Sequence, residues 1–437
     1  MKVTLLDQAR AYLEQGAYAR AKEAYIAALL PDRYHIDGML GLAAAYVGLE
    51  DFPSAHTVLA RAVARHPHLP EAHADLGAVL IELDQLAAAR EALLDALRIS
   101  PFMRKAWCAL GVVFERQGDL EQADHAWAQA FRDGGPALST FRGERDPVPV
   151  LLLWSAVDGN VPVKPFLDER VFQWSTLFVE SYLEGMPLPP HAVVFNAVGN
   201  ADLPIRALER AESIARATHA PVVNQPARVR RTGRAAVAER LREIPGVVTP
   251  RMTAVARRDL REGRLQGLSW PLLIRAPGFH SGRYFERVSE PAELPGALAA
   301  VPGEDLLAIE FLDTREDDGW YRKYRVLTID GRLYPLHVAS SRDWKVHAFS
   351  AGRHDAFALE GLDPPAQTAL ERAADALGLD YGGIDFALAA DGRVVIFEAN
   401  ATMRIVPVGS GPRAIDGSAR RAAEAAVAMI AQRAKCT

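Results

Sequence analysis

The first third of the chain is organised by a spacing of small and large apolar residues that repeats every 34 positions. Large apolar or aromatic side chains recur at Tyr12, Tyr46, Leu80 and Phe114, and again at Tyr25, Leu59, Leu93 and Trp127. Small residues keep the same step, at Ala9, Ala43, Gly77 and Gly111 and at Ala21, Ala55, Ala89 and Ala123. Four registers in phase predict four stacked helix pairs between residues 3 and 131, with the small residues where two helices touch.

This period resembles that of the tetratricopeptide repeat (TPR) family, and we assign residues 1–135 to a TPR domain of four helix pairs. Pro67 and Pro101 close two repeats at the same interval, whereas Pro31 comes two residues early and makes the first stacking contact less regular. Such an array either docks a peptide or protein on its concave surface or acts as a dimerisation or purely structural arm. The sequence leaves these roles, and a homodimer, open.

A second pattern begins near residue 145, where Asp146-Pro-Val-Pro ends the helical periodicity and is predicted to be a linker. Apolar runs of strand length then alternate with helical stretches, the runs at Val148–Trp154, 192–195 and 221–224 and the helices at 207–217 and 233–244. This alternation predicts an α/β domain at 147–249. The loop at 155–160 is either a ligand loop at the carboxyl end of a parallel strand or a plain turn.

The remainder, 250–437, is also mixed α/β, and an early strand in it carries a cation at its end. This strand ends in Arg275 and runs into a loop that contains Gly278, His280, Ser281 and Gly282. A guanidinium binds two phosphate oxygens at once, and the N–H groups of a Gly-rich loop add further donors. The segment therefore suits phosphate binding.

Two later strands carry further candidate residues. The first, from residue 306, ends in Glu310, Phe311, Leu312 and Asp313. The second, Tyr321–Ile329, precedes the hairpin turn Asp330-Gly331, and its alternation places Lys323 and Arg325 on one face. These cations either meet a triphosphate or substrate carboxylate or belong to a solvated face. The segment 334–347 has no periodicity, and its histidines are either structural or orient substrate.

The most informative short pattern is a pair of β-rich runs on either side of Asp391-Gly392. Asp-Gly between such runs predicts a hairpin with a two-residue loop. In that register Ala390 pairs with Arg393, and Asp385 lies directly opposite Glu398.

Opposed acids raise the question of what offsets their repulsion, because like charges across a strand pair are destabilising. Asn400 projects from the same face as Glu398 and adds an amide oxygen. Either the acids of an exposed edge hairpin point into water, or a hard cation such as Mg²⁺ binds these oxygens.

Composition and charge argue against several classes of protein. A net charge of −5 and a pI of about 6.2 give no global attraction to nucleic acid or to anionic membranes. The two cysteines, Cys108 and Cys436, have no CxxC-like neighbours, which argues against a disulfide framework or a structural zinc site. The N-terminus lacks the apolar core of a signal peptide, and no apolar run reaches the roughly 18 residues of a membrane helix. We expect a cytoplasmic protein.

Together, the order of these pieces resembles the ATP-grasp superfamily of ADP-forming ligases over residues 147–437. The likeness rests on a preceding α/β domain, a cationic strand with a Gly/Ser loop, a Glu-containing hinge strand, a basic strand and Asp…Glu-x-Asn. The segments 224–229 and 244–250 also resemble that family's approach to its nucleotide domain. The resemblance implies a pre-ATP-grasp domain at 147–249 and an ATP-grasp domain at 250–437.

The resemblance also implies roles for individual residues. Asp385, Glu398 and Asn400 match magnesium ligands, with two ions expected, and Arg275, Lys323 and Arg325 match catalytic cations. ATP would be bound by Arg275, Gly278, His280, Ser281, Gly282, Glu310, Phe311, Leu312, Asp313 and Lys323. Arg275 departs from the lysine that the family commonly has there, which leaves the phosphate geometry open.

Proteins of this family form an acyl phosphate from ATP and a carboxylate, and an amine or another nucleophile then displaces phosphate. The expected function is therefore a carboxylate–amine ligase whose TPR domain recruits a peptide or protein, as in peptide tailoring or natural-product biosynthesis. A kinase that uses the same site and a non-catalytic TPR scaffold with a relic ATP-grasp domain are the alternatives. The complete Asp/Glu/Asn set weighs against the relic.

Overall fold

The computed structural model describes residues 4–157, 159–202, 206–265, 267–277, 282, 284–346, 353–405 and 413–435. The chain divides into two compact units, Met1–Gly134 and Gly135–Thr437. We describe each unit by itself.

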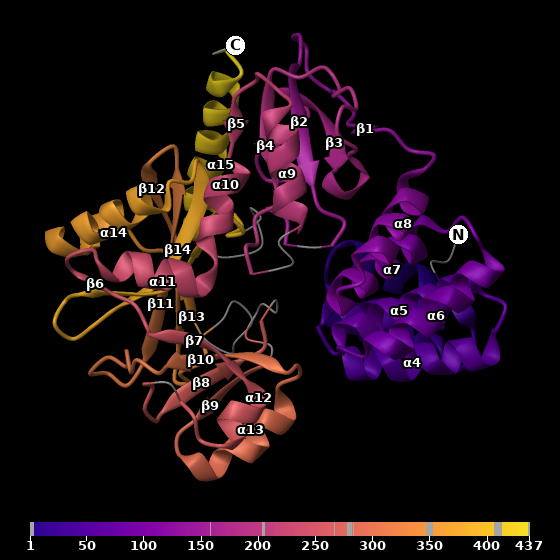
Figure 1. The fold of residues 1–437 in the computed structure, drawn as a ribbon, viewed down its shortest axis with the longest axis horizontal. Helices are drawn as coiled ribbons and strands as arrows, with labels where there is room; N and C mark the ends of the chain where they lie inside the picture. Colours follow the sequence, from indigo (N-terminus) through magenta and orange to yellow (C-terminus); the bar gives the residue numbers. More distant parts are fainter. Residues whose placement is uncertain are drawn as a thin grey trace. The chain divides into compact units, whose positions relative to one another are not determined.

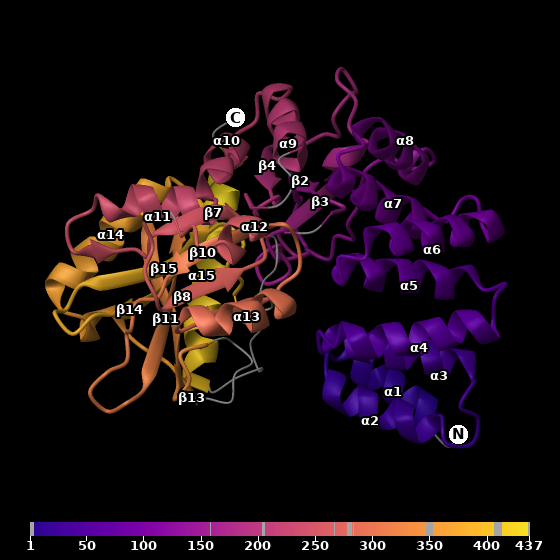
Figure 2. The same ribbon diagram turned by 60° about the horizontal axis from the view of Figure 1, so that its bottom comes forward.

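The first unit is the predicted stack of four helix pairs (Figures 1 and 2). Its helices are α1 (Leu5–Glu14), α2 (Tyr18–Ala28), α3 (Ile36–Gly48), α4 (Phe52–Arg65), α5 (Pro70–Glu82), α6 (Leu86–Ile99), α7 (Arg104–Gln117) and α8 (Leu120–Phe131). The turns inside the pairs repeat as well, because a left-handed backbone conformation recurs every 34 residues, at Gly16, Glu50, Asp84 and Gly118. The repeat domain is thus confirmed, with a further register that the side chains alone did not reveal.

The small repeat positions are the points where paired helices touch. The four alanines at 21, 55, 89 and 123 have no exposed surface. A Cβ added at Gly77 would lie 2.5 Å from Leu93, and one added at Gly111 would lie 2.5 Å from Trp127. Such a separation is much shorter than a van der Waals contact. The large side chain on one helix therefore leaves room only for a small residue at the facing position of its partner helix.

Within its described residues the second unit contains three sheets, of which the first is mostly parallel. It comprises β1 (Ala137–Leu138), β2 (Val148–Trp154), β3 (Phe172–Phe178), β4 (Val193–Asn196) and β5 (Val222–Val223), in the order β1-β3-β2-β4-β5. Only β1 pairs antiparallel, with β3. The apolar side of α9 (Arg206–Arg216) packs into the core of this sheet (Figure 1).

A second, four-stranded sheet is antiparallel throughout. It comprises β7 (Met252–Ala256), β8 (Leu272–Arg275), β9 (Phe285–Val288) and β10 (Asp305–Glu310), in the order β7-β10-β8-β9. It has its own small core, to which α12 (Arg257–Arg261) and α13 (Leu294–Ala300) contribute leucines.

The third sheet has six strands in the order β13-β12-β11-β14-β15-β6. These are β6 (Val247–Val248), β11 (Tyr321–Ile329), β12 (Arg332–Ser341), β13 (Arg353–Asp355), β14 (Tyr381–Leu388) and β15 (Val394–Asn400). Helices α14 (Pro364–Leu377) and α15 (Arg413–Arg433) pack against it (Figure 1). Neighbours pair antiparallel except β6 and β15, which are parallel.

Asn224 ties the first sheet to the third. It follows β5, has no exposed surface and adopts a left-handed φ of 56°. Its side chain accepts from the Tyr381 N–H at 2.9 Å and donates to the Tyr381 carbonyl at 2.8 Å, at the start of β14. The amide therefore completes the hydrogen bonding of a strand end that lies 157 residues away in sequence.

The structure differs from the expectations at two points. The second unit begins before the expected linker at Asp146, because β1 already pairs with β3. The strands β3 and β12 were not predicted, and in β12 Pro335 lies beside a bulge that the irregular pattern conceals. The division into 147–249 and 250–437 stays a prediction, although β6, just before residue 250, already belongs to the third sheet.

The predicted hairpin is present, but its loop is longer than expected. Ala389, not Ala390, pairs with Arg393, and Gly392 closes the turn with a left-handed φ of 82°. A bulge at Phe397 offsets the extra loop residue, because Phe386 opposes Ile396 while Asp385 opposes Glu398. The predicted pairing of Asp385 opposite Glu398 is confirmed, because the extra loop residue and the bulge shift the register in opposite directions.

We expect Gly111→Ala to destabilise the repeat domain by about 1–3 kcal/mol, because the added methyl group overpacks the fully buried Trp127. The gain in helix propensity does not compensate, since the indole has no room to move. Chemical denaturation followed by far-UV circular dichroism measures the effect.

Gly296→Ala serves as the control, because Gly296 is also helical and its added Cβ meets nothing within 4 Å. Equal stability of the wild-type chain and Gly111→Ala would contradict this account of the repeat contact.

Candidate active site

Strands β11, β14 and β15 bring the predicted acids and cations to one face of the six-stranded sheet, which we call the front face. Arg325 lies opposite Asp385, and Asp385 lies opposite Glu398. Lys323 and Arg325 both contact the Asp385 carboxylate, so their predicted position on a common face is confirmed.

Asp385 is the centre of this cluster, with 1% of its surface exposed. Arg325 binds it bidentately, from Nε to Oδ1 at 2.6 Å and from Nη2 to Oδ2 at 2.8 Å. The ammonium of Lys323 lies 3.1 Å from Oδ2. Burial alone would raise the pKa of Asp385, but the two cations hold it well below its ordinary value. The carboxylate is therefore ionised throughout the neutral range.

Glu398 is held by Arg234, the first residue of α11 (Arg234–Arg242). Its Nη2 donates to Glu398 Oε1 at 2.5 Å, and its Nη1 donates to Asp202 Oδ2 at 3.0 Å. The side chain of Arg234 is only 9% exposed. Burial would lower the pKa of Arg234, but the two carboxylates raise it above its ordinary value. This chain of ion pairs joins the loop after β4 to the end of β15.

Asn400 completes the oxygen-bearing set. Its amide nitrogen donates to Glu398 Oε1 at 2.9 Å, and its Oδ1 accepts from the backbone N–H and the hydroxyl of Thr402, both at 2.9 Å. Three hard oxygen donors on one face have the chemistry that Mg²⁺ requires. Mg²⁺ would have to share or displace the hydrogen bonds that these oxygens accept from Arg325, Lys323 and Arg234.

The repulsion between the opposed acids is offset by cationic side chains in this structure. Each acid has its own guanidinium, Arg325 at Asp385 and Arg234 at Glu398. In the described ranges no three His, Cys, Asp or Glu side chains cluster as a metal site would require. The assignment of Asp385, Glu398 and Asn400 as metal ligands stays a prediction, which the repulsion argument no longer supports by itself.

Arg275 ends β8 in the four-stranded sheet and faces the same cluster. It is 8% exposed, and its guanidinium lies 5.3 Å from the centre of the Phe285 ring. Burial, with a contribution from Arg234, lowers the pKa of Arg275 to about 10, whereas Glu398 acts in the opposite direction. These interactions place Arg275 near Glu398 of β15, with its positive charge retained at neutral pH.

Aromatic side chains join the four-stranded sheet to the segment that follows β12. Trp344, just after β12, lies 5.4 Å from Phe285 and 6.1 Å from Phe311, measured between ring centres. The guanidinium of Arg287 lies 4.1 Å from the centre of the Phe311 ring. Lys345 donates to the carbonyl of Phe285 at 2.9 Å, so it also links the two sheets. Flat apolar surfaces and cations thus occur together, and Phe285 lies next to Arg275.

The remaining predicted nucleotide contacts are placed only in part. Glu310 ends β10 and accepts from Arg251, through the backbone N–H at 3.0 Å and the guanidinium at 3.3 Å. Leu312 is half-buried, and Asp313 is exposed and pairs with Arg315. The segment does connect the four-stranded to the six-stranded sheet, as a hinge would. Of the loop residues, Gly282 has a left-handed φ of 74°, while Gly278, His280 and Ser281 lie outside the described residues.

His337 belongs to the front face as well. It lies opposite Arg325 on β12 and is 7% exposed. Burial, reinforced by Arg325, lowers the pKa of His337 to about 4. His337 is therefore neutral at pH 7, with an imidazole that can accept or donate a hydrogen bond.

The sequence did not reveal Arg234, Asp202, Arg287 or Phe285 as site residues. Arg234 stands at the start of a predicted helix, 164 residues before Glu398, and Asp202 lies in a connection still earlier in the chain. No local pattern marks such residues, because only the packing of α11 against β15 brings them to Glu398. The run of basic residues at 228–234 was the one available signal.

The fold and site define a two-part protein, a TPR array followed by an α/β unit whose sheets enclose an ionic cluster. The sequence model of the family described as tetratricopeptide repeat matches residues 46–110. Comparison with curated protein sequences gives no match.

Several solved structures are similar to the chain. One is the ATP-grasp ligase PsnB complexed with precursor peptide PsnA2 and AMPPNP, with 18% identity, 65% of this chain and 98% of that chain covered, and a TM-score of 0.42. Another is the VanG D-Ala:D-Ser ligase from Enterococcus faecalis, with 14% identity, coverages of 65% and 100%, and a TM-score of 0.45. A third is MamA, with 24% identity, coverages of 29% and 72%, and a TM-score of 0.27.

Among the described residues, no helix is both long enough and apolar enough to cross a bilayer.

We expect Arg234→Gln to destabilise the second unit by about 2–4 kcal/mol, because Glu398 and Asp202 lose the charge that compensates them in a largely buried position. Equilibrium unfolding in urea measures the loss. The double variant Arg234→Gln/Glu398→Gln should recover part of it, since one uncompensated carboxylate is then removed. Exposed Arg231→Gln is the control, and a loss as large in that variant would contradict the assignment.

Stability should fall between pH 7 and pH 5, because His337 is neutral in the fold but binds a proton when unfolded. The pKa of His337 is depressed to about 4 in the folded chain. The unfolded state therefore binds more protons in this window, at a cost on the order of 2 kcal/mol. His337→Gln should reduce this pH dependence in urea unfolding, whereas exposed His219→Gln should not. An unchanged slope in His337→Gln would refute the assignment.

Proposed function

We propose that the second unit is an ATP- and Mg²⁺-dependent ligase of the ATP-grasp type, which forms ADP while joining a carboxylate to an amine. The observation that carries the proposal is the front face of β14 and β15, where oxygens of Asp385, Glu398 and Asn400 are aligned within a ring of cations. These cations are Lys323, Arg325, Arg234 and Arg275. They exceed the three carboxylates Asp202, Asp385 and Glu398 by one charge, which suits a site for polyanions.

The donor set fits a magnesium ion, and we propose Asp385, Glu398 and Asn400 as its ligands. When bound, Mg²⁺ would neutralise charge on the transferring phosphoryl group. Two such ions are expected from the resemblance. Arg325 and Lys323, which hold Asp385 now, lie where they can exchange that carboxylate for phosphate or for a substrate acid.

Binding of the nucleotide would be divided between the two sheets. Arg275, buried and charged, can hold phosphate oxygens from the four-stranded sheet. We propose that Glu310, Phe311, Leu312 and Asp313 contact the adenosine, and that the loop residues Gly278, His280, Ser281 and Gly282 add hydrogen-bond donors for the phosphates. The aromatic faces of Phe311 and Trp344 offer stacking surfaces for a planar base.

The chain's own residues can then support transfer of a phosphoryl group to a carboxylate. Lys323 and Arg325 would orient the acid and stabilise negative charge on the transferring phosphoryl group as ADP leaves, in a position where burial strengthens electrostatic interactions. The product would be an acyl phosphate, from which an amine displaces phosphate. Neutral His337, beside Arg325, can position either reactant by hydrogen bonding.

We propose that the TPR array recruits a peptide or protein, which would make the substrate a peptide. A kinase remains the second candidate, because the same ionic site would serve phosphoryl transfer that ends at the phosphorylated acceptor.

The test is ADP and phosphate release from Mg²⁺-ATP with a panel of amino acids and peptides, with products identified by mass spectrometry. The ligase predicts ADP, phosphate and a condensed product, all dependent on an acceptor, with peptides preferred. A stable phosphorylated product without free phosphate would establish the kinase instead. Absence of ADP with every acceptor would refute both.

Glu398→Gln should lower the turnover at least about hundredfold while the chain stays folded, because charge stabilisation at the phosphoryl group is lost. Asp391→Asn, at the exposed tip of the same hairpin, is the matched control and should keep full activity. Substantial turnover in Glu398→Gln would remove Glu398 from the metal site.

A further inference from the structure

The reverse face of β11, β12 and β13 carries a second set of polar and aromatic side chains. Side chains alternate along a strand, so the neighbours of Lys323 and Arg325 in β11, Arg322 and Tyr324, project away from Asp385. The pairing extends this face across the sheet, because Arg322 lies opposite Ser340, and Ser340 lies opposite Arg353. The front and reverse faces are thus chemically distinct sites on shared strands.

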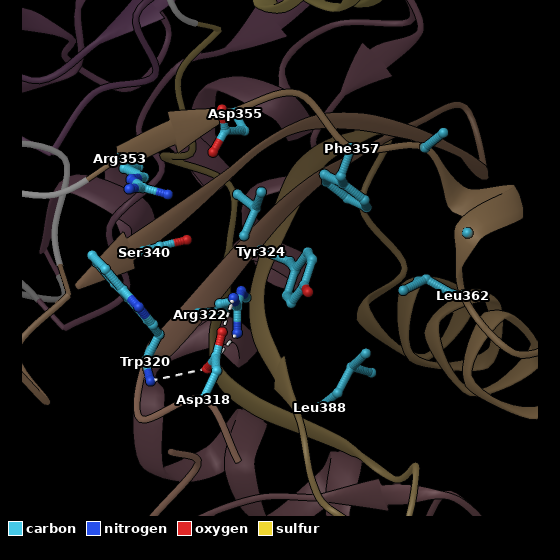
Figure 3. Close-up of a pocket in the computed structure, with 13 residues that line it drawn as sticks. Asp318, Trp320, Arg322, Tyr324, Ser340, Arg353, Asp355, Phe357, Leu362 and Leu388 are labelled. Atoms are coloured by element: carbon cyan, nitrogen blue, oxygen red, sulfur yellow. Dashed lines mark hydrogen bonds and ion pairs between the residues drawn. The ribbon is translucent and has the colours of Figure 1, made fainter. Parts of the chain in front are cut away.

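A cavity of about 410 Å³ opens on the reverse face (Figure 3). Its volume lies within the roughly 300–1,000 Å³ of small-molecule pockets. The charged and hydroxyl-bearing groups Arg353, Ser340 and Asp318 lie on one side, and Phe357, Leu362 and Leu388 lie on the other. The cavity therefore has a polar end and an apolar end.

Not all of its charges are available to a ligand. Arg322 is engaged by Asp318 and Glu316, and its bonds to Asp318 are among the dashed lines in Figure 3. The guanidinium of Arg353 lies 5.3 Å from the centre of the Trp320 ring. Within the described residues, the side chains of Arg353 and Asp355 take part in no ion pair or hydrogen bond.

These two ions stand at alternate positions of β13, on the same face. Their Cα atoms are about 7 Å apart along the strand. A molecule with an ammonium and a carboxylate group on one carbon can reach both side chains, each through a charge-assisted hydrogen bond. Such a molecule would direct its third substituent toward the apolar end, over Phe357 and Leu362.

We propose that this cavity binds a free α-amino acid with an apolar or aromatic side chain. Arg353 receives the carboxylate, Asp355 receives the ammonium group, and Tyr324, Phe357, Leu362 and Leu388 surround the side chain. The hydroxyls of Ser340 and Tyr324 offer further hydrogen bonds. The site is separate from the nucleotide site proposed above, and its occupation requires neither ATP nor metal.

Isothermal titration of the full chain with L-phenylalanine and L-leucine, in the absence of ATP and Mg²⁺, tests the proposal. Both amino acids should bind, and L-lysine and L-glutamate should bind more weakly. N-acetyl-L-phenylalanine lacks the ammonium group and L-phenylalanine amide lacks the carboxylate, so each should lose affinity about tenfold or more.

Variants assign the two ends of the ligand. Arg353→Gln should weaken L-phenylalanine about tenfold or more and change the affinity of the amide little. Asp355→Asn should likewise weaken L-phenylalanine about tenfold or more, and it should change the affinity of N-acetyl-L-phenylalanine little. Both residues are exposed, so folding should persist, and Arg332→Gln on β12 is the control.

No binding of L-phenylalanine or L-leucine at millimolar concentration, or equal affinities in wild type and both variants, would overturn the proposal. Binding of peptides alone would do the same.

Discussion

Asp385 carries a full negative charge where almost none of its surface meets water, and Arg325 and Lys323 are the reason that it can. A buried carboxylate without its counter-charges would be strongly disfavoured, whereas the complete group contributes little net stability, because desolvation of all three charges offsets their attraction. An apolar core would serve the six-stranded sheet as well. The ionic centre therefore constrains β11, β14 and β15 for a purpose other than holding the fold together.

The same logic extends from Asp385 to the neighbouring sheets. Arg234 compensates the charge of Glu398 and also pairs with Asp202. These two ion pairs link the loop after β4 to the end of β15. Arg275 adds a cation from the four-stranded sheet, where burial already weakens its hold on the proton. Three sheets thus contribute to one electrostatic balance, and a change in any of them alters the charge seen by the others.

Much of this arrangement could be predicted from the sequence, where the responsible pattern was local. The 34-residue period fixed the repeat helices, and alternation in Tyr321–Ile329 correctly placed Lys323 and Arg325 on one face. Asp-Gly correctly placed Asp385 opposite Glu398, although the loop length was wrong. Arg234 and Asp202 could not be predicted, since their roles arise only when α11 and the loop after β4 pack beside β15. The strand β12 was hidden because its bulge and Pro335 disturb the alternation by which strands are found.

The bulge at Phe397 has a consequence for how this hairpin can change in evolution. Without it, Phe397 would oppose Asp385, and Glu398 and Asn400 would turn to the reverse face of the sheet. Insertions or deletions at the exposed tip can be absorbed by the loop itself, as its third residue already illustrates. A single insertion or deletion between the bulge and Asn400 would instead exchange the two faces of the strand end. The hairpin therefore has a tolerant tip and an intolerant base, and Phe397 marks the boundary between them.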